Sequence, residues 1–284
     1  MAYARTALVT GGSHGIGYEV CRGLAARGSR VIVHAPTPAE AHAAVDRLIR
    51  DGADRGLLHA AAADFRRLDD VTSLAERLNR QHDRIDLLIN NAGAIAPVGR
   101  TVDGFDVTLQ INYLAHYVLT RTLGRALNTG GGRVVTVGSA LHRDGHLDVD
   151  DPDGATDPRP VETYASAQLA LVLFTRALAL SAERRITAVA VHPGLIDTGT
   201  FTAAYGIGGL PAADGAAHVL HAADAGVEVV NGGYYEGLLP AQPARAARDD
   251  AAALRLWQAT ARLRGWDYTA ARGPIRRAAA PRAA

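Results

Sequence analysis

The chain has 284 residues, a formal net charge of +1 and a single cysteine, Cys21. This length suits one α/β domain. The small net charge argues against a broad binding surface for nucleic acid or an anionic membrane, and one cysteine excludes an internal disulfide. No apolar run reaches the length of a membrane span, and no signal-peptide pattern opens the chain. These features predict a cytoplasmic protein with no nucleic-acid or membrane partner.

Apolar, β-rich runs alternate with longer periodic segments, which is typical of strands buried on both faces and joined by crossover helices. The predicted strands are residues 7–10, 31–34, 57–61, 85–90, 133–138, 186–192 and 233–235. The predicted helices are residues 16–27, 39–51, 69–81, 104–127, 163–182, 212–225 and 249–264. This order predicts an α/β fold, a single Rossmann-type doubly wound domain whose seven-stranded parallel sheet is flanked by helices on both faces.

The predicted domain spans residues 1–269, and the Ala/Arg/Pro-rich residues 270–284 are expected to form a tail outside it. Ligands of a doubly wound sheet bind beyond the carboxyl ends of its strands. The segments that directly follow predicted strands are therefore the places to look for a site.

The first strand-to-helix junction carries the sequence Thr10-Gly11-Gly12-Ser13-His14-Gly15-Ile16-Gly17. Gly11 permits a tight turn, while Gly15 and Gly17 let a diphosphate and the neighbouring strand approach the backbone. The helix start adds unpaired N–H groups and a positive dipole end. A flexible Gly-rich loop is the alternative, but the position of the pattern favours a nucleotide-binding turn.

The segment after the second strand, His34-Ala35-Pro36-Thr37, bears on the choice of cofactor. An acidic side chain here would bind the ribose hydroxyls of NAD, and an arginine would accept the 2′-phosphate of NADP. The chain has neither. The missing acid weakly favours NADP over NAD, with His14 or Thr37 as phosphate contacts. Asp64, at the end of the third strand, is a candidate contact to the adenine amino group or a cap of the following helix.

Polar residues also follow the fourth and fifth strands. Asn90-Asn91-Ala92-Gly93 suits a backbone pressed against a ligand, although it also suits an ordinary turn. Asn112 is the odd polar residue of an apolar helix and must find partners, and it is expected to bend the helix through a water or a backbone carbonyl. Ser139 follows the fifth strand. Tyr164 and Gln168 are four residues apart and therefore share one helix face.

Taken together these residues resemble the short-chain dehydrogenase/reductase family, from about Thr6 to Asp267, and its retinol-dehydrogenase-like branch in particular. The resemblance is carried by the Gly-rich turn and by Ile111-Asn112-Tyr113-Leu114-Ala115-His116, Gly138-Ser139-Ala140-Leu141-His142, Thr163-Tyr164-Ala165-Ser166-Ala167-Gln168 and His192-Pro193-Gly194.

The resemblance implies a role for each matching residue. Gly11, Gly15 and Gly17 would hold the diphosphate of NADP or NAD, with Ser13, His14 and Ile16 in the same turn. The remaining cofactor contacts would be Asp64, Asn91, Ala92, Gly93 and the segment from Pro193 and Gly194 to Thr198. Asn112, which would organise water behind the site, would form the reaction centre with Ser139, Tyr164 and Gln168. No metal is implied.

The chain departs from the family pattern at Gln168, where the family has a lysine four residues after the tyrosine. The lysine ammonium hydrogen-bonds the nicotinamide ribose and lowers the pKa of the tyrosine. A carboxamide retains part of the first function but not the second. All 30 basic residues of this chain are arginine, so no lysine can be recruited from elsewhere.

Three hypotheses follow. The protein is a carbonyl reductase of a small, largely apolar or natural-product substrate. Alternatively, the scaffold performs non-redox chemistry, such as cyclisation, dehydration or epimerisation, with Tyr164, Ser139 or His142 as the acid or base. The third hypothesis is a catalytically silent cofactor-binding partner. The apolar faces of the helices at residues 104–127 and 163–182 further suggest a homodimer or homotetramer.

Overall fold

The computed structural model describes residues 5–153, 159–181, 185–197, 209–263 and 265. The elements along the chain are β1 (Thr6–Val9), α1 (Gly15–Ala26), β2 (Arg30–Ala35), α2 (Pro38–Arg50), η1 (Arg55–Leu57), β3 (Leu58–Ala62), α3 (Leu68–Gln81), β4 (Leu87–Asn90), α4 (Val107–Leu109), η2 (Gln110–Leu114), α5 (Ala115–Thr122), α6 (Gly124–Gly130), β5 (Arg133–Val137), η3 (Ala140–Arg143), α7 (Pro160–Leu180), β6 (Thr187–His192), α9 (Ala212–Ala223), β7 (Gly233–Glu236), β8 (Leu239–Ala241), η4 (Arg245–Arg248) and α10 (Asp250–Leu263).

The sheet has eight strands in the order β3-β2-β1-β4-β5-β6-β7-β8. The first seven are parallel to one another, as predicted, and the doubly wound α/β class is confirmed. The predicted strand count is wrong by one, because β8 pairs antiparallel with β7. Gly237, with φ of +60°, closes the short turn between them. Little in the sequence predicts β8, since Pro240 suits only an edge strand and is also typical of a loop.

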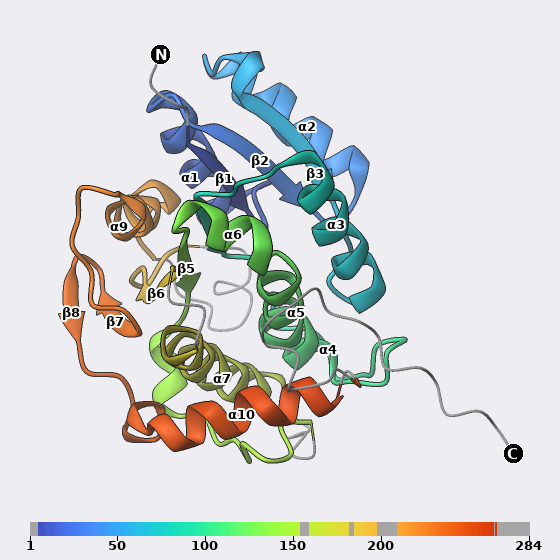
Figure 1. The fold of residues 1–284 in the computed structure, drawn as a ribbon, viewed down its shortest axis with the longest axis vertical. Coiled ribbons are helices and arrows are strands. Elements are labelled where there is room, and N and C mark those ends of the chain that lie inside the picture. Colours follow the sequence, from blue (N-terminus) through green and yellow to red (C-terminus); the bar gives the residue numbers. More distant parts are fainter. Residues whose placement is uncertain (1–4, 154–158, 182–184, 198–208, 264, 266–284) are drawn as a thin grey trace, which may run out of the picture.

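Helices cover both faces of the sheet (Figure 1). One apolar cluster joins alternate strand residues such as Leu8 and Leu88 to α3, α5 and α7, and α10 packs outside α7. The other cluster joins Val9, Val33 and Val191 to α1, α2 and α9. Successive side chains of a strand therefore point into the helix layers on opposite faces of the sheet, which explains the nearly continuous apolar character of the strands.

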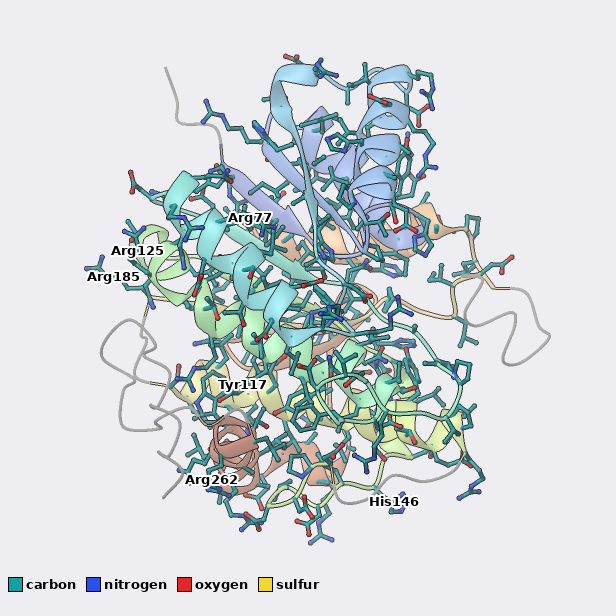
Figure 2. All side chains as sticks on the ribbon, turned by 90° about the vertical axis from the view of Figure 1, so that its right-hand side faces the viewer. Arg77, Tyr117, Arg125, His146, Arg185 and Arg262 are labelled. Atoms are coloured by element: carbon teal, nitrogen blue, oxygen red, sulfur yellow. The ribbon has the colours of Figure 1, made fainter. Side chains whose placement is uncertain are left out.

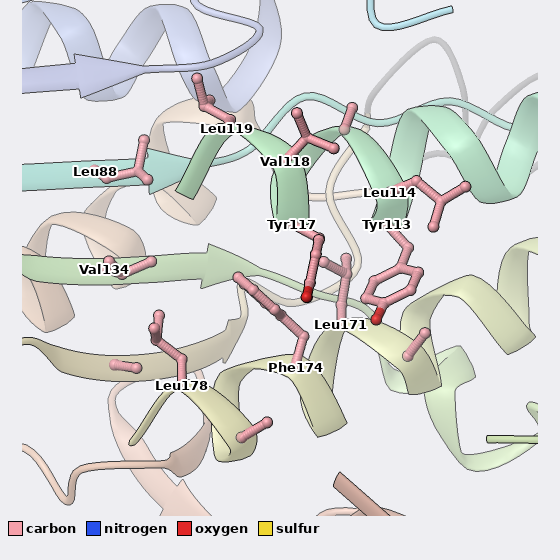
Figure 3. Packing of buried hydrophobic residues seen from close by; sticks show 14 of the residues in the cluster. Leu88, Tyr113, Leu114, Tyr117, Val118, Leu119, Val134, Leu171, Phe174 and Leu178 are labelled. Atoms are coloured by element: carbon pink, nitrogen blue, oxygen red, sulfur yellow. The ribbon is translucent and has the colours of Figure 1, made fainter. Parts of the chain in front are cut away.

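The predicted helix at residues 104–127 is divided in the structure into α4, the π-helix η2, α5 and α6. Its aromatic side chains lie between α5 and α7, where Tyr117 and Phe174 point toward one another with ring centroids 6.1 Å apart (Figure 3). Figure 2 shows Tyr117 in the interior, whereas Arg125, Arg185 and Arg262 project from the outside of the molecule.

The helix α10 covers the surface that was expected to form a subunit contact. Trp257 of α10 stacks on Phe174 with ring centroids 5.9 Å apart, and the Tyr113 hydroxyl lies 2.6 Å from the Thr260 hydroxyl. Part of the apolar surface that was expected to form a subunit contact is therefore covered within one chain. The homodimer or homotetramer stays a prediction.

Among the described residues, α7 is the one helix long and apolar enough to cross a membrane. However, 72% of its most apolar window is buried inside the protein, between the sheet and α10. A core helix of a doubly wound fold accounts for this composition.

Candidate active site

A cleft of about 670 Å³ opens beyond the carboxyl ends of β1, β4, β5 and β6. It brings together most of the predicted site residues: Gly11, His14, Gly15, Ile16, Asn91, Ala92, Gly93, Asn112, Ser139, Tyr164, Gln168, Pro193 and Gly194. Ser13, Gly17 and Asp64 are not part of its lining. Thr198 and the tail of residues 270–284 lie outside the described residues.

The Gly-rich turn has the backbone geometry that a phosphate-binding turn requires. Gly11 and Gly15 have φ of +63° and +55°, a region that favours glycine. Gly17 stands where a Cβ atom would come within 2.2 Å of the Gly11 carbonyl oxygen, so only glycine lets α1 pack this closely against the turn. This crowding explains why Gly17 supports the turn without lining the cleft.

His34 holds the same turn in place through hydrogen bonds of both ring nitrogens. Its Nδ1 accepts a hydrogen bond from the Gly11 N–H at 3.3 Å, and its Nε2 donates to the Ala63 carbonyl at 3.1 Å. Both bonds require a neutral ring with the proton on Nε2. Burial lowers the pKa of His34 to about 4, which keeps the ring neutral at ordinary pH.

The wall formed after β4 is held by side chains rather than left as a free turn. The Asn91 amide donates to the Thr10 carbonyl at 2.8 Å and thereby joins β4 to the Gly-rich turn. The His116 Nε2 donates to the Ala92 carbonyl at 2.7 Å, and Phe65 packs between the rings of His34 and His116. His116 is thus a packed helix residue.

Asp64, the expected adenosine contact after β3, pairs with Arg66 at 2.9 Å. Burial raises the pKa of this carboxyl, but hydrogen bonds and charge from Arg66 outweigh burial, and the net pKa lies below its usual range. The alternative reading as a helix cap is wrong, because the N-cap position of α3 is Arg67. The Leu68 N–H at the helix start is bound instead by the Asp103 carboxylate at 2.8 Å.

Asn112 bends its helix through backbone groups, which is one of the two routes that the sequence predicted. Its amide nitrogen donates to the carbonyls of Thr108 and Ala94, both at 2.7 Å, and its oxygen accepts from the Ala94 N–H at 3.1 Å. The π-helix η2 spans this point, and π turns often occur at functional sites. Both amide protons are used by the protein, so any water would have to bind the remaining oxygen lone pair.

Ser139, Tyr164 and Gln168 reach the cleft from two elements. Ser139 directly follows β5 and accepts a hydrogen bond from the Leu141 N–H at 3.3 Å. Tyr164 and Gln168 lie one turn apart on α7. Gln168 is only 3% exposed, and none of the described residues hydrogen-bonds its Oε1 atom. A buried polar atom in a cleft wall needs a partner, so this atom points to a ligand.

His142, considered above as an acid or base, cannot serve as one in this structure. It is 0% exposed. Its Nδ1 donates to the Ser139 carbonyl at 2.8 Å, and its Nε2 accepts from the Ala244 N–H at 3.0 Å. With both ring nitrogens occupied, His142 joins the Ser139 segment to the chain after β8. It is a positioning residue for Ser139.

The segment after β6 forms the far wall. Gly194 has φ of +101°, and His218 of α9 donates from Nδ1 to the Pro193 carbonyl at 2.8 Å. His192, which the sequence analysis quoted only as part of a motif, also lines the cleft. Its Nδ1 atom has no hydrogen-bond partner among the described residues. Burial lowers the pKa of this ring.

This lining fits a dinucleotide. The glycines of the turn leave room where side chains would otherwise lie, and the start of the helix offers backbone N–H groups to a phosphate. The unpartnered Gln168 oxygen offers a further polar contact in the cleft. No group of three or more metal-ligating side chains occurs among the residues whose structure is described.

Comparison with known proteins agrees with this geometry. The family model described as short chain dehydrogenase matches residues 5–205, and the chain belongs to this family. It is 30% identical to human (Homo sapiens) retinol dehydrogenase 13 over 94% of this chain and 87% of that protein. It is 34% identical to mouse (Mus musculus) polyprenol dehydrogenase over 92% of this chain and 84% of that protein.

Among solved structures, it resembles a blue fluorescent protein from a metagenomic library in complex with NADPH, at 29% identity and a TM-score of 0.62. That alignment covers 82% of this chain and 97% of that one. The predicted resemblance to short-chain dehydrogenases is confirmed, and the protein is an oxidoreductase enzyme of a family that uses nicotinamide cofactors.

Proposed function

We propose that the protein interconverts a carbonyl and an alcohol on a small, largely apolar substrate, with NADP or NAD as cofactor. The observation that carries the proposal is the convergence of Ser139, Tyr164 and Gln168 with the Gly-rich turn on one cleft. These residues come from segments far apart in the sequence, and the parallel sheet places them at one edge.

Each side chain has a defined task in the proposed reaction. The neutral Tyr164 hydroxyl donates a proton to the carbonyl oxygen of the substrate, and the Ser139 hydroxyl hydrogen-bonds that same oxygen as negative charge develops. Bound nicotinamide supplies the hydride in this direction. Asn112 holds the chain at Ala94 and so keeps the cleft wall in place.

Gln168 takes the place of the family's lysine. Its carboxamide can hydrogen-bond a ribose hydroxyl of the cofactor, and its unpartnered, buried Oε1 atom supports this assignment. It contributes no positive charge near Tyr164. We therefore propose an active site in which proton donation proceeds without a neighbouring ammonium group.

The rim of the cleft supports an apolar substrate. Ile95, Leu141 and Leu195 line it, and Leu195 is 56% exposed. The names of the relatives, retinol dehydrogenase and polyprenol dehydrogenase, refer to apolar alcohols. NADP is the proposed cofactor, because Ala35 and Pro36 leave no acid to repel a 2′-phosphate.

The missing ammonium also favours a second candidate, non-redox chemistry such as cyclisation, dehydration or epimerisation of a natural product. The acid or base would then be Tyr164 or Ser139, since His142 is fully engaged. A silent cofactor-binding partner is the third candidate. A cytoplasmic location and the absence of a membrane partner stay predictions.

The assay that separates these candidates follows NADPH absorbance during incubation with apolar aldehydes and ketones. The proposal predicts cofactor oxidation in step with alcohol formation, and a loss of about 100-fold or more in Tyr164→Phe. Tyr235→Phe is the matched control, because the Tyr235 hydroxyl binds the Val230 N–H within β7 and its flanking loop. Substrate turnover without cofactor oxidation would instead establish the non-redox candidate, and binding without any turnover the silent partner.

A further inference from the structure

The segment after β2 lacks the side chain that usually binds a 2′-phosphate. In dinucleotide-binding folds an arginine after the second strand provides this contact, but this chain has Ala35, Pro36 and Thr37 there. Thr37, expected above as a phosphate contact, caps α2 by accepting a hydrogen bond from the Glu40 N–H at 3.3 Å. A positive charge for the phosphate must therefore come from elsewhere.

Arg47, on the third turn of α2, reaches the Gly-rich turn. Its guanidinium donates to the backbone carbonyl of Ser13. The guanidinium carbon lies 4.2 Å from the centroid of the Tyr18 ring. Tyr18 is itself fixed, being 7% exposed with its hydroxyl bound to the Asp51 carboxylate at 2.6 Å. Stacking on a buried ring and a bond to the turn hold the long side chain of Arg47 in one place.

The charge of Arg47 is available. Among the described residues no carboxylate lies within ion-pair distance of its guanidinium, whereas Arg22 and Arg27 on α1 both have acidic partners. The bond to Ser13 and the contact with the Tyr18 hydroxyl leave further N–H donors of the planar fork for a ligand. His14 is the next residue of the turn, and its Nδ1 atom lies 3.1 Å from the Ser13 hydroxyl.

The position of Arg47 matches the place where the phosphate must lie. The ribose 2′-oxygen of a bound dinucleotide sits between the Gly-rich turn and the carboxyl end of the second strand. In this structure the two are in direct contact, because the Gly12 N–H donates to the His34 carbonyl at 2.8 Å. Ser13 is the next residue of the turn, and its carbonyl accepts the hydrogen bond from Arg47.

We propose that Arg47, assisted by His14, binds the 2′-phosphate of NADP(H) and determines the cofactor preference of this enzyme. The inference rests on the proposed function, because it requires a dinucleotide in the cleft. It assigns to the third turn of α2 a role that the segment after β2 cannot fulfil here. Arg47 can hold the phosphate with paired N–H donors, which is the arrangement that arginine favours for phosphate groups.

The test measures binding rather than turnover. Dissociation constants for NADPH, NADH and adenosine 2′,5′-bisphosphate are determined calorimetrically for wild type, Arg47→Gln and Arg50→Gln. Arg50 lies on the same helix and is also exposed, and none of the described contacts joins it to the turn, which makes it the matched control. A thermal unfolding curve for each variant verifies that it is folded.

We expect Arg47→Gln to weaken the binding of NADPH and of the bisphosphate by about 10- to 100-fold. The dissociation constant for NADH should change by less than about threefold. Arg50→Gln should match wild type. Equal weakening of NADPH and NADH in Arg47→Gln, or no change in either, would overturn the assignment of Arg47 while leaving the dinucleotide site intact. Failure of folded wild type to bind either dinucleotide would instead overturn the proposed function.

Discussion

Gln168 is the residue on which the chemistry of this enzyme depends most. It is buried in the cleft wall one helical turn after Tyr164, at the position where the family resemblance implies a lysine. An ammonium at this position would bind the cofactor ribose and stabilise the phenolate of Tyr164, whereas a carboxamide can do only the former.

We therefore predict that Gln168→Lys raises the rate of carbonyl reduction and moves the alkaline limb of the pH–rate profile to lower pH. The measurement is kcat/KM for NADPH-dependent reduction across pH 6 to 10. Gln168→Met, which removes the polar contact, should raise the KM for the cofactor. If Gln168→Lys left both the rate and the profile unchanged, the proposed role of this position would be wrong.

Two buried histidines next to the site make the free energy of unfolding depend on pH. Burial lowers the pKa of His34 and of His116 to about 4, from an ordinary value of 6.5. Each ring stays neutral in the folded protein while the unfolded chain takes up a proton below about pH 6.5. The stability is thus complete above this pH and falls as the pH drops from 6.5 toward 4.

The expected loss between pH 7.5 and pH 5 is about 2 kcal/mol of unfolding free energy per histidine. Urea unfolding at the two pH values measures it. His34→Gln, whose amide can replace both hydrogen bonds, should remove one histidine's share of the loss. The exposed His14→Gln serves as the control. An undiminished loss in His34→Gln would contradict the assigned neutral ring.

These side chains also mark the limit of sequence interpretation at the residue scale. The motifs identified Tyr164, Ser139 and the glycines of the turn, because each sits next to a strand or helix boundary that periodicity can locate. They did not reveal that His142 is enclosed by the chain after β8, or that His34 holds Gly11. Such contacts join segments far apart in the sequence, and no local pattern encodes them.

At the scale of elements, strong periodicity was sufficient for β1 to β7 and for most helices. The segment at residues 104–127 differs because the Asn112 amide donates to the carbonyls of Thr108 and Ala94, at the point where the helix widens into a π turn. The sequence also did not show which elements α10 packs against. The sequence predicted a helix at residues 249–264, but only the three-dimensional structure identifies α5 and α7 as what it covers.

Trp257 is the side chain through which α10 covers that surface. It stacks on Phe174 and meets the edge of Tyr117 at a centroid distance of 4.9 Å. We predict that Trp257→Ala lowers the free energy of unfolding by about 3 kcal/mol and exposes the α5–α7 surface, so that the protein self-associates. Urea unfolding and light scattering measure the two effects.

Arg262→Ala, at an exposed position of the same helix, should change stability by less than about 0.5 kcal/mol. A Trp257→Ala protein that remained as stable as wild type would show that α10 is not an integral part of the core.

At the scale of the whole molecule, the parallel sheet converts separate sequence motifs into one site. β1, β4, β5 and β6 end at the same edge and are held there by Asn91, His34 and His142. The doubly wound topology could be predicted from the alternation of strands and helices. The substrate could not, because pocket shape depends on how several loops meet.

The central claim is that this cleft binds a nicotinamide dinucleotide on the Gly-rich turn. Calorimetric titration of NADPH and NADH into wild type, Gly17→Ala and Gly99→Ala tests it most directly. A Cβ atom at Gly17 would lie 2.2 Å from the Gly11 carbonyl oxygen, whereas one at Gly99 would meet nothing closer than 3.9 Å. The account predicts binding to wild type and Gly99→Ala, and binding weakened by about tenfold or more in Gly17→Ala. Folded wild-type protein that gives no binding heat with either dinucleotide would contradict it.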